Sequence, residues 1–229
     1  MKRIERLGEA AAPDGTVLTL YRHDGAYSIS VGGTELMSTR RHHSEDALAE
    51  LVCAPLAERA GARVLIGGLG LGFTLRAALR TLAADAQVVV VEIMEEVIRW
   101  NRNPDYALSA DALADPRVDL RHDDVANVLA AGDGGFDAIM LDVDNGAAAM
   151  TTKGNAALYR AAGIRRAVAA LRPGGRLAYW SAGEDAPFEK ALRRERLEVE
   201  VHRVRAHPTL KAWHTIFVAR PVERAARSP

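Results

Sequence analysis

The sequence predicts an α/β protein with a doubly wound, mostly parallel, seven-stranded sheet and a small β segment before it. From Arg63 onward, short apolar runs alternate with amphipathic stretches, an order typical of strands joined by crossover helices. A cluster of glycines, GGLGLG, directly follows the first of these strands. A loop of roughly ten residues separates the last two strands, which should therefore pair antiparallel, because parallel neighbours need a longer crossover.

The first forty or so residues are typical of β-hairpins. The runs TVLTLYRHDG and AYSISVGG are rich in β-forming residues and end in DG and GG dipeptides. We expect residues 1–43 to form a small N-terminal β-hairpin segment. A helix should begin near Ser44, which can cap it, and Glu45 and Asp46 suit the positive N-terminus of that helix.

The main domain, residues 44–220, should contain the whole seven-stranded sheet. Its strands are predicted in RVLIGG, QVVVVE, RVDLRH, FDAIMLD, RLAYWS, EVEVHRV and HTIFVA. Apolar residues at helical spacing predict a helix after each of the first five strands. The longest of these helices runs from about Ala157 to Leu171 and should be stopped by RPGG. The polar tail, residues 221–229, is expected to be flexible.

The composition is typical of a globular protein with its own hydrophobic core. The 229 residues are 48% hydrophobic and 26% charged, and 30 Lys+Arg balance 30 Asp+Glu. This balance gives no support for a nucleic-acid partner, and the single cysteine excludes a disulfide framework and a cysteine zinc site. No apolar run approaches the roughly 20 residues of a membrane helix. We expect a cytoplasmic protein that acts on a small molecule without a metal or a membrane; a homodimer stays open.

The glycine turn indicates a ligand at the carboxyl edge of the sheet. Its spacing, Gly68-x-Gly70-x-Gly72, is tighter than the G-x-G-x-x-G of dinucleotide-binding proteins and suits a cofactor without a pyrophosphate. A purely structural strand-to-helix turn would also use glycines. Glu92 ends the second strand, where its carboxylate can accept bonds from both ribose hydroxyls. An NAD protein also carries an acid there, so Glu92 alone does not discriminate between these cofactors.

Other candidate residues follow the later strands. Asp123 can accept a bond from an adenine amino group or can cap a helix, and Asp124 is the alternative cap. Asp142 ends the fourth strand, where a carboxylate can take a proton from an amine or orient it. Trp180 ends the fifth strand and can stack on the substrate or pack at the rim of the core. Asp144 is a turn former first and a candidate for substrate contact second.

The stretch Arg40 to His43 is basic and precedes the first helix. His43 is a candidate for contact with the substrate and for proton transfer, although loop histidines are commonly just exposed. Arginines at the mouth of a site would favour a carboxylate or phosphate, and a solvated basic turn is the alternative. No third ligand is spaced near His42 and His43, so we expect no metal.

In this order, five stretches resemble the spermidine synthase family of aminopropyltransferases, which has the Rossmann-like fold of class I methyltransferases. They are VLIGGLGLGFTLRAAL, VVVVEIMEEVIRWNR, DPRVDLRHDDVANVL, FDAIMLDVDNG and LRPGGRLAYWS. The resemblance implies a sulfonium nucleoside as cofactor, either S-adenosylmethionine or decarboxylated S-adenosylmethionine. It also implies that Glu92 holds the ribose, that Asp123 holds the adenine amine, and that Asp142 activates the attacking amine.

The sequence departs from the family pattern at two places. The synthases carry an aspartate in G-G-G-D-G-G that contacts cationic amino groups, and Gly70 stands at the matching position. The synthases also carry D-S-S-D-P after the fourth strand, where this chain has DVDNG; Asn145 replaces the second acid, and Asp144 can substitute for it in part. Because an unpaired buried ammonium is costly, these losses weaken the case for a diamine substrate.

Four functions are compatible with these observations. We place first a transferase that uses S-adenosylmethionine to alkylate, by methylation, a small amine-bearing nucleophile. The second is aminopropyl transfer from decarboxylated S-adenosylmethionine to a polyamine, and the third is a nucleoside-binding protein without catalysis. The fourth, an NAD-dependent oxidoreductase, is disfavoured by the glycine spacing and the antiparallel last strand. Asp142 favours the two transferases over the third function, and Gly70 favours the first over the second.

Overall fold

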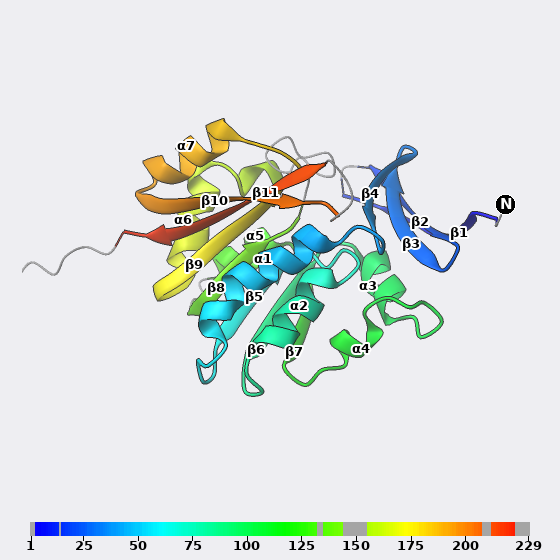
Figure 1. The fold of residues 1–229 in the computed structure, drawn as a ribbon, viewed down its shortest axis with the longest axis horizontal. Coiled ribbons are helices and arrows are strands. Elements are labelled where there is room, and N and C mark those ends of the chain that lie inside the picture. Colours follow the sequence, from blue (N-terminus) through cyan, green and yellow to red (C-terminus); the bar gives the residue numbers. More distant parts are fainter. Residues whose placement is uncertain (1–2, 14, 132–134, 144–154, 208–211, 223–229) are drawn as a thin grey trace, which may run out of the picture.

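Two β-sheets organise the chain in the computed structural model, which describes residues 3–13, 15–131, 135–143, 155–207 and 212–222. An antiparallel sheet of four strands lies at the N-terminal end, and a sheet of seven strands, covered by helices, forms the body of the molecule (Figure 1). The predicted doubly wound α/β fold with a small β segment before it is confirmed. The division into residues 1–43 and 44–220 stays a prediction, and most of the predicted tail, from residue 223, lies outside the described residues.

The N-terminal sheet is a meander in which each strand pairs antiparallel with the next. Its strands are β1 (Glu5–Ala11), β2 (Val17–His23), β3 (Ala26–Val31) and β4 (Thr34–Ser38). The two-residue turn between β2 and β3 has positive φ at both Asp24 and Gly25, a backbone that matches the twist of a tight hairpin. The hairpins predicted from the DG and GG dipeptides are therefore confirmed, and β1 extends them by a strand that the sequence pattern did not indicate.

The seven-stranded sheet has the order β10-β11-β9-β8-β5-β6-β7. Its strands are β5 (Arg63–Gly67), β6 (Gln87–Glu92), β7 (Val118–His122), β8 (Phe136–Leu141), β9 (Leu171–Ser181), β10 (Leu197–Arg205) and β11 (Trp213–Pro221). The first five of these strands run parallel, and β11 pairs antiparallel with both β9 and β10, as the short final loop predicted. The carboxyl ends of β5, β6, β7 and β8 consequently meet at one edge.

Helices cover both faces of this sheet (Figure 1). They are α1 (His43–Cys53), α2 (Phe73–Thr81), α3 (Glu95–Arg102), α4 (Ala110–Leu113), α5 (Val125–Ala130), α6 (Ala161–Ala169) and α7 (Ala186–Arg194), with 3-10 turns η1 (Ala54–Leu56) and η2 (Asn155–Ala157). Because side chains alternate along a strand, Ile66 packs toward α1 and α2 whereas Leu65 packs toward α5, α6 and α7. Among the described residues, no helix has both the length and the apolar character needed to span a bilayer.

Two segments differ from the prediction. Helix α6 ends at Ala169, and the RPGG sequence belongs to β9, which already pairs with β8 at Leu171. A register shift in this pairing, together with the positive φ of Gly174, absorbs the turn-forming residues as an irregularity inside the strand. Helix α4 was not predicted, because four residues are too few to show a helical period.

A third apolar cluster joins the N-terminal sheet to the main body. Leu20 and Ile29 of this sheet pack against Met94, beside α3, and Trp100 of that helix. The approach is close, because a Cβ placed on Gly8 would lie 2.8 Å from the indole nitrogen of Trp100. This contact holds β4 over the glycine turn that follows β5, where Met37 approaches Gly70.

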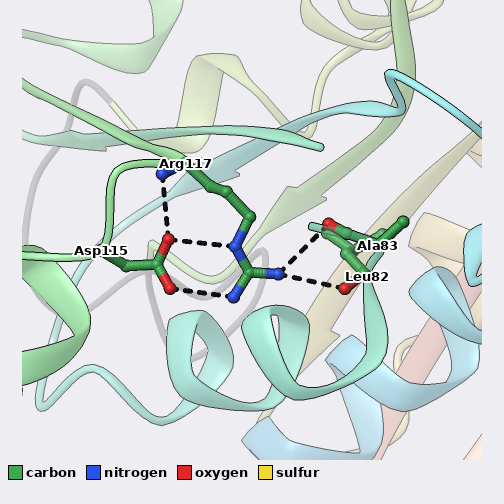
Figure 2. A network of polar contacts seen from close by, with 4 residues as sticks. All are labelled: Leu82, Ala83, Asp115 and Arg117. Carbon is green, nitrogen blue, oxygen red and sulfur yellow. Dashed lines mark hydrogen bonds and ion pairs between the residues drawn. The ribbon is translucent and has the colours of Figure 1, made fainter. Parts of the chain in front are cut away.

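Arg117, just before β7, ties the edge of the sheet to the end of α2 (Figure 2). Its guanidinium donates to both carboxylate oxygens of Asp115, at 3.0 and 2.9 Å, and to the carbonyl oxygens of Leu82 and Ala83, at 3.0 and 3.3 Å. The last carbonyl groups of a helix lack intrahelical partners, and Arg117 supplies donors in that region. The charge-assisted bonds from Arg117 hold the pKa of Asp115 below its ordinary value.

Candidate active site

The carboxyl edge of the parallel strands opens into a cavity of about 570 Å³. Gly68, Glu92, Asp123 and Asp142, which follow or end four different strands, all line it. The opposite walls come from β4, the start of α1 and the start of β11. The predicted placement of these residues at one edge is thus what the structure shows, and their roles toward a ligand stay predictions.

Hydrogen bonds fix the strand ends at this edge to one another. The N–H of Gly68 donates to the carbonyl of Val91 at 2.8 Å, and the N–H of Asp142 donates to the carbonyl of Gly67 at 2.9 Å. The N–H of Asp123 donates to the carbonyl of Glu92 at 3.1 Å. The ladder of the sheet therefore continues into the residues that line the cavity.

The glycine turn is shaped by close packing as well as by the cavity. Gly68 has φ near +95°, and a Cβ there would lie 2.3 Å from the carbonyl oxygen of Asp142. Gly70 also has positive φ, and a Cβ there would lie 3.0 Å from the sulfur of Met37. Gly72 precedes α2 and is not part of the cavity wall. A Cβ placed on Gly72 would lie 2.3 Å from the Cβ of Ser109. Two of the three predicted cofactor glycines thus face the cavity, and Gly72 serves packing between helices.

Glu92 holds the glycine turn through hydrogen bonds to the backbone. One carboxylate oxygen accepts from the N–H of Leu69 and the other from the N–H of Met94, both at 2.9 Å. Only 8% of Glu92 is exposed, and burial raises the pKa of its carboxyl while the backbone bonds oppose the rise. A carboxylate that already orders the turn can also accept from ribose hydroxyls, because each oxygen carries two lone pairs.

Asp123 and Asp124 were both candidates for the helix N-cap, and the structure gives that place to Asp124. Asp124 is the N-cap of α5 and accepts from the N–H of Ala126 at 2.8 Å. Asp123 is exposed at the cavity and accepts through Oδ1 from the N–H of Asp124 and the side chain of Asn127. These bonds, from Asn127 foremost, lower the pKa of Asp123. Its Oδ2 is available to a ligand amine.

Asp142 lines the cavity directly after β8. The hydroxyl of Thr74, in the first turn of α2, donates to its Oδ2 at 2.9 Å. Burial raises the pKa of the Asp142 carboxyl, against the effect of this hydrogen bond. Asp144, the predicted partner in substrate contact, lies outside the described residues.

Trp180 and His43 have different surroundings. Trp180 lines the cavity with 7% of its surface exposed, and within the described residues its indole N–H has no hydrogen-bond partner. His43 is exposed at the start of α1 and does not line the cavity. The neighbouring His42 stacks on Phe73 with ring centres 4.0 Å apart, and its Nδ1 lies 2.7 Å from Oδ2 of Asp46. His43 as a substrate contact therefore stays a prediction that the cavity does not support.

Several cavity residues were not singled out as ligand contacts from the sequence. Glu45 was assigned only to the helix N-terminus, yet it faces the cavity opposite the strand ends. Arg41 and Glu35 line the wall as an ion pair, and His214 contributes from β11. The basic character of Arg41 was noted in the sequence; the other positions carried no motif. Among the described residues, no cluster of three or more His, Cys, Asp or Glu side chains could hold a metal.

Among the comparisons with known proteins, the one with solved structures gives matches. No protein-family profile matches the sequence, and no curated protein matches it. The spermidine synthase from Thermotoga maritima superposes with a TM-score of 0.73 at 19% identity, covering 95% of this chain and 74% of that one. A spermidine synthase in complex with the transition-state analogue AdoDATO gives 0.71 at 17% identity, covering 95% and 73%. The chain has the fold of the spermidine synthases.

Proposed function

We propose that this protein is a transferase that moves an aminopropyl group from decarboxylated S-adenosylmethionine to an amine. The observation that carries the proposal is the pair of carboxylates, Asp142 and Glu45, that face one cavity with the glycine turn and Glu92. Within the described residues, no cationic side chain is among the groups that shift the pKa of either carboxyl. A site of this kind favours cationic ligands, because an ammonium group supplies the charge that the two acids lack.

The likeness to spermidine synthases supports the same reaction. One of these similar structures holds a transition-state analogue, which marks that protein as a transferase. In this chain, Glu92 would accept from the ribose, Asp123 from the adenine amine, and the turn at Gly68 would let the nucleoside approach the main chain. Glu45 also offers a carboxylate that the comparison of motifs did not count, so the loss of the acid at Gly70 is compensated in part.

Asp142 would act on the acceptor amine. The amine is an ammonium ion at neutral pH, and it must lose a proton before its lone pair can attack the carbon beside the sulfonium. As the new C–N bond forms, the C–S bond breaks, and its electron pair leaves the sulfur as a neutral thioether. The carboxylate of Asp142 takes the proton or holds the amine in line, which also supplies orientation.

Methyl transfer from S-adenosylmethionine is a second candidate, and two observations favour it. Gly70 and Met37 form an apolar wall at the place where the synthases have an aspartate. Arg41 lines the cavity and is suited to bind the carboxylate of an amino-acid group, although it already pairs with Glu35.

Thermal-shift and product measurements separate the two candidates. Under the proposal, decarboxylated S-adenosylmethionine raises the melting temperature more than S-adenosylmethionine at equal concentration, because the tighter ligand stabilises the native state more. Incubation with diamines then yields methylthioadenosine, the leaving group of aminopropyl transfer. Accumulation of S-adenosylhomocysteine instead would overturn aminopropyl transfer in favour of methylation. Binding without turnover for either donor would favour the non-catalytic alternative.

Substitution of Asp142 tests the assigned role. Asp142→Asn keeps the shape of the side chain and removes its charge, so we expect donor affinity near that of the wild type and turnover lower by about two orders of magnitude or more. Calorimetry measures the affinity, and release of methylthioadenosine measures turnover. Wild-type turnover in a folded Asp142→Asn protein would place the base elsewhere.

A further inference from the structure

Glu45 belongs to the reacting end of the cavity although it comes from a different part of the fold. It lies in the first turn of α1, whereas Asp142 follows β8, and both side chains line the same cavity and are partly buried. Burial first, and then the charge of Asp142, raises the pKa of Glu45. Two acids that face one partly buried cavity ionise together less readily than either would alone.

A chain of hydrogen bonds leads away from Glu45. The hydroxyl of Ser44 donates to Oε2 of Glu45 at 2.5 Å, and the same hydroxyl lies 2.8 Å from Nδ1 of His214. Ser44 is fully buried behind the wall, and His214, at the start of β11, is partly buried and lines the cavity. Burial and then the charge of Arg41 lower the pKa of His214, which favours release of a proton from its imidazolium.

A second observation marks this end of the cavity as a ligand site. The indole of Trp180 packs edge-on against His214, with ring centres 4.7 Å apart, and its N–H has no hydrogen-bond partner within the described residues. A buried indole N–H usually finds a partner, so this donor indicates a polar group supplied by the ligand.

Other charged groups around Glu45 do not complete a proton path. Asp46, on α1, contacts His42 and Arg80, and Arg41 pairs with Glu35 of β4. The remaining acids that line the cavity stand at the strand ends and are Glu92, Asp123 and Asp124. Within the part of the chain that the structure describes, none of these groups hydrogen-bonds to Ser44 or Glu45, whereas His214 is joined to Glu45 through Ser44.

We propose that Glu45 and Asp142 act as a pair that receives the proton of the acceptor amine, and that Ser44 and His214 carry this proton to the rim of the cavity. The inference rests on the proposed function. It gives Glu45 a catalytic role beside Asp142, as an acceptor of the amine proton. It makes Ser44 and His214 positioning residues for the release of that proton.

The transfer balances without a further reactant. The pair holds one proton at rest, and the ammonium of the acceptor gives it a second and becomes the attacking amine. Protonated Glu45 donates to Oγ of Ser44, Ser44 passes its own proton to Nδ1 of His214, and Nε2 of His214 releases a proton to water. The carboxyl pair and the hydroxyl are thereby restored, and the imidazole is left as its Nδ1–H tautomer. Rotation of the ring or proton exchange with water returns it to the Nε2–H tautomer before the next turnover.

The first experiment needs no ligand. Carbon-13 NMR of the carboxyl groups in the full chain should show one protonated acid at neutral pH, and Glu45→Gln or Asp142→Asn should each remove that signal. Glu50→Gln, an exposed position on the same helix, is the matched control and should leave the signal unchanged. Independent ionisation of both acids well below neutral pH would overturn the pair.

The second experiment tests the path with decarboxylated S-adenosylmethionine and putrescine. Ser44→Ala and His214→Asn should lower kcat about tenfold or more without changing donor affinity, and free imidazole should rescue His214→Asn in part. His202→Asn, on the neighbouring strand β10, is the control. Wild-type pH profiles in both variants, or no rescue by imidazole, would overturn the path.

The two proposals fail in different ways. If the wild type turns over and the Glu45 and His214 variants match it, the path is wrong and the proposed function stands. If the wild type binds neither donor and releases no product, the proposed function is wrong and the path has no proton to carry. In that case the carboxyl spectrum still decides whether Glu45 and Asp142 share a proton.

Discussion

Gly70 lacks a side chain at a position where both backbone conformation and charge matter. Its φ is +52°, and an added Cβ would approach the sulfur of Met37 at 3.0 Å. An aspartate at this position therefore brings backbone strain and a steric contact as well as a charge. The contribution of the charge can be measured only against a substitution that carries the same strain.

Gly70→Asp and Gly70→Ala together separate these effects. Both should destabilise the protein by about 1–2 kcal/mol, because a left-handed backbone disfavours any side chain. We expect Gly70→Asp to weaken S-adenosylmethionine binding relative to Gly70→Ala, since two carboxylates then face each other, and to weaken binding of the decarboxylated form less or not at all. Calorimetry with both ligands provides the comparison. Equal losses for the two ligands would leave only the steric effect.

The raised pKa of Glu45 has a consequence for stability in the absence of ligand. A carboxyl whose pKa is raised by folding contributes stability that is fully present below its ordinary pKa and is lost as pH rises through the folded value. Glu45→Gln should therefore be more stable than the wild type at about pH 8, by on the order of 1–2 kcal/mol, and should match it at about pH 4. Melting curves across this range test the sign. A variant less stable than the wild type at high pH would contradict the shift assigned to Glu45.

The sequence predicted that the acids at the ends of strands would line the cavity. It did not predict the cavity residues that come from α1 and β11. Glu92 and Asp142 stand directly at the carboxyl ends of strands, so the topology alone brings them together. The bond between Ser44 and His214 joins positions 170 residues apart, and no local pattern encodes such a meeting. Glu45 has a local explanation as a helix N-terminal acid, which concealed its place in the cavity.

Arg117 illustrates how an element is fixed by one side chain. It joins the loop before β7 to the C-terminal end of α2 through Asp115, Leu82 and Ala83. We expect Arg117→Met to cost about 1–3 kcal/mol of unfolding free energy at neutral pH, because the partly buried acceptors lose their donors. Arg99→Met, which breaks an exposed pair with Glu95, is the control and should cost about 0.5 kcal/mol or less.

The loss of unfolding free energy caused by Arg117→Met should be smaller at acid pH than at neutral pH. Asp115 has a lowered pKa in the folded protein, so its contribution is present above its ordinary pKa and is lost as pH falls through the folded value. Denaturant titrations of both proteins at neutral and acid pH measure this difference. A cost that does not change with pH would mean that the carbonyl bonds to Leu82 and Ala83 provide the whole effect.

Helices and strands were predicted correctly where the pattern of apolar residues is long and continuous. The prediction failed where this pattern is short or interrupted. The strands of the main sheet are apolar runs bounded by turn residues, and the hairpins carry DG and GG turns. Strand β1, with the sequence ERLGEAA, has no run of β-branched residues and depends on pairing with β2. The RPGG segment reads as a helix stop, which is correct, but tertiary pairing with β8 also recruits it into β9.

For the whole molecule, the relative directions of the strands in the main sheet followed from the lengths of the connections between them. The packing of the N-terminal sheet on α3 did not, because it depends on the shape match of Gly8 with Trp100 rather than on a pattern. This packing is what brings Met37 to Gly70 and so completes the cavity. The side of the site formed by the N-terminal strands is thus a property of the assembled fold.

The hydrogen-bond ladder that runs past the strand ends makes the site rigid before any ligand arrives. The amides of Gly68, Asp123 and Asp142 donate to neighbouring strands, so their hydrogen exchange should require an opening nearly as costly as global unfolding. The amide of Asp124, bonded to the exposed side chain of Asp123, should exchange much faster. Exchange monitored by NMR gives the comparison, and similar rates for all four amides would show that the edge frays. A nucleoside that meets an edge already ordered loses little affinity to the conformational entropy of the protein, so the binding free energy can go to aligning the reacting groups.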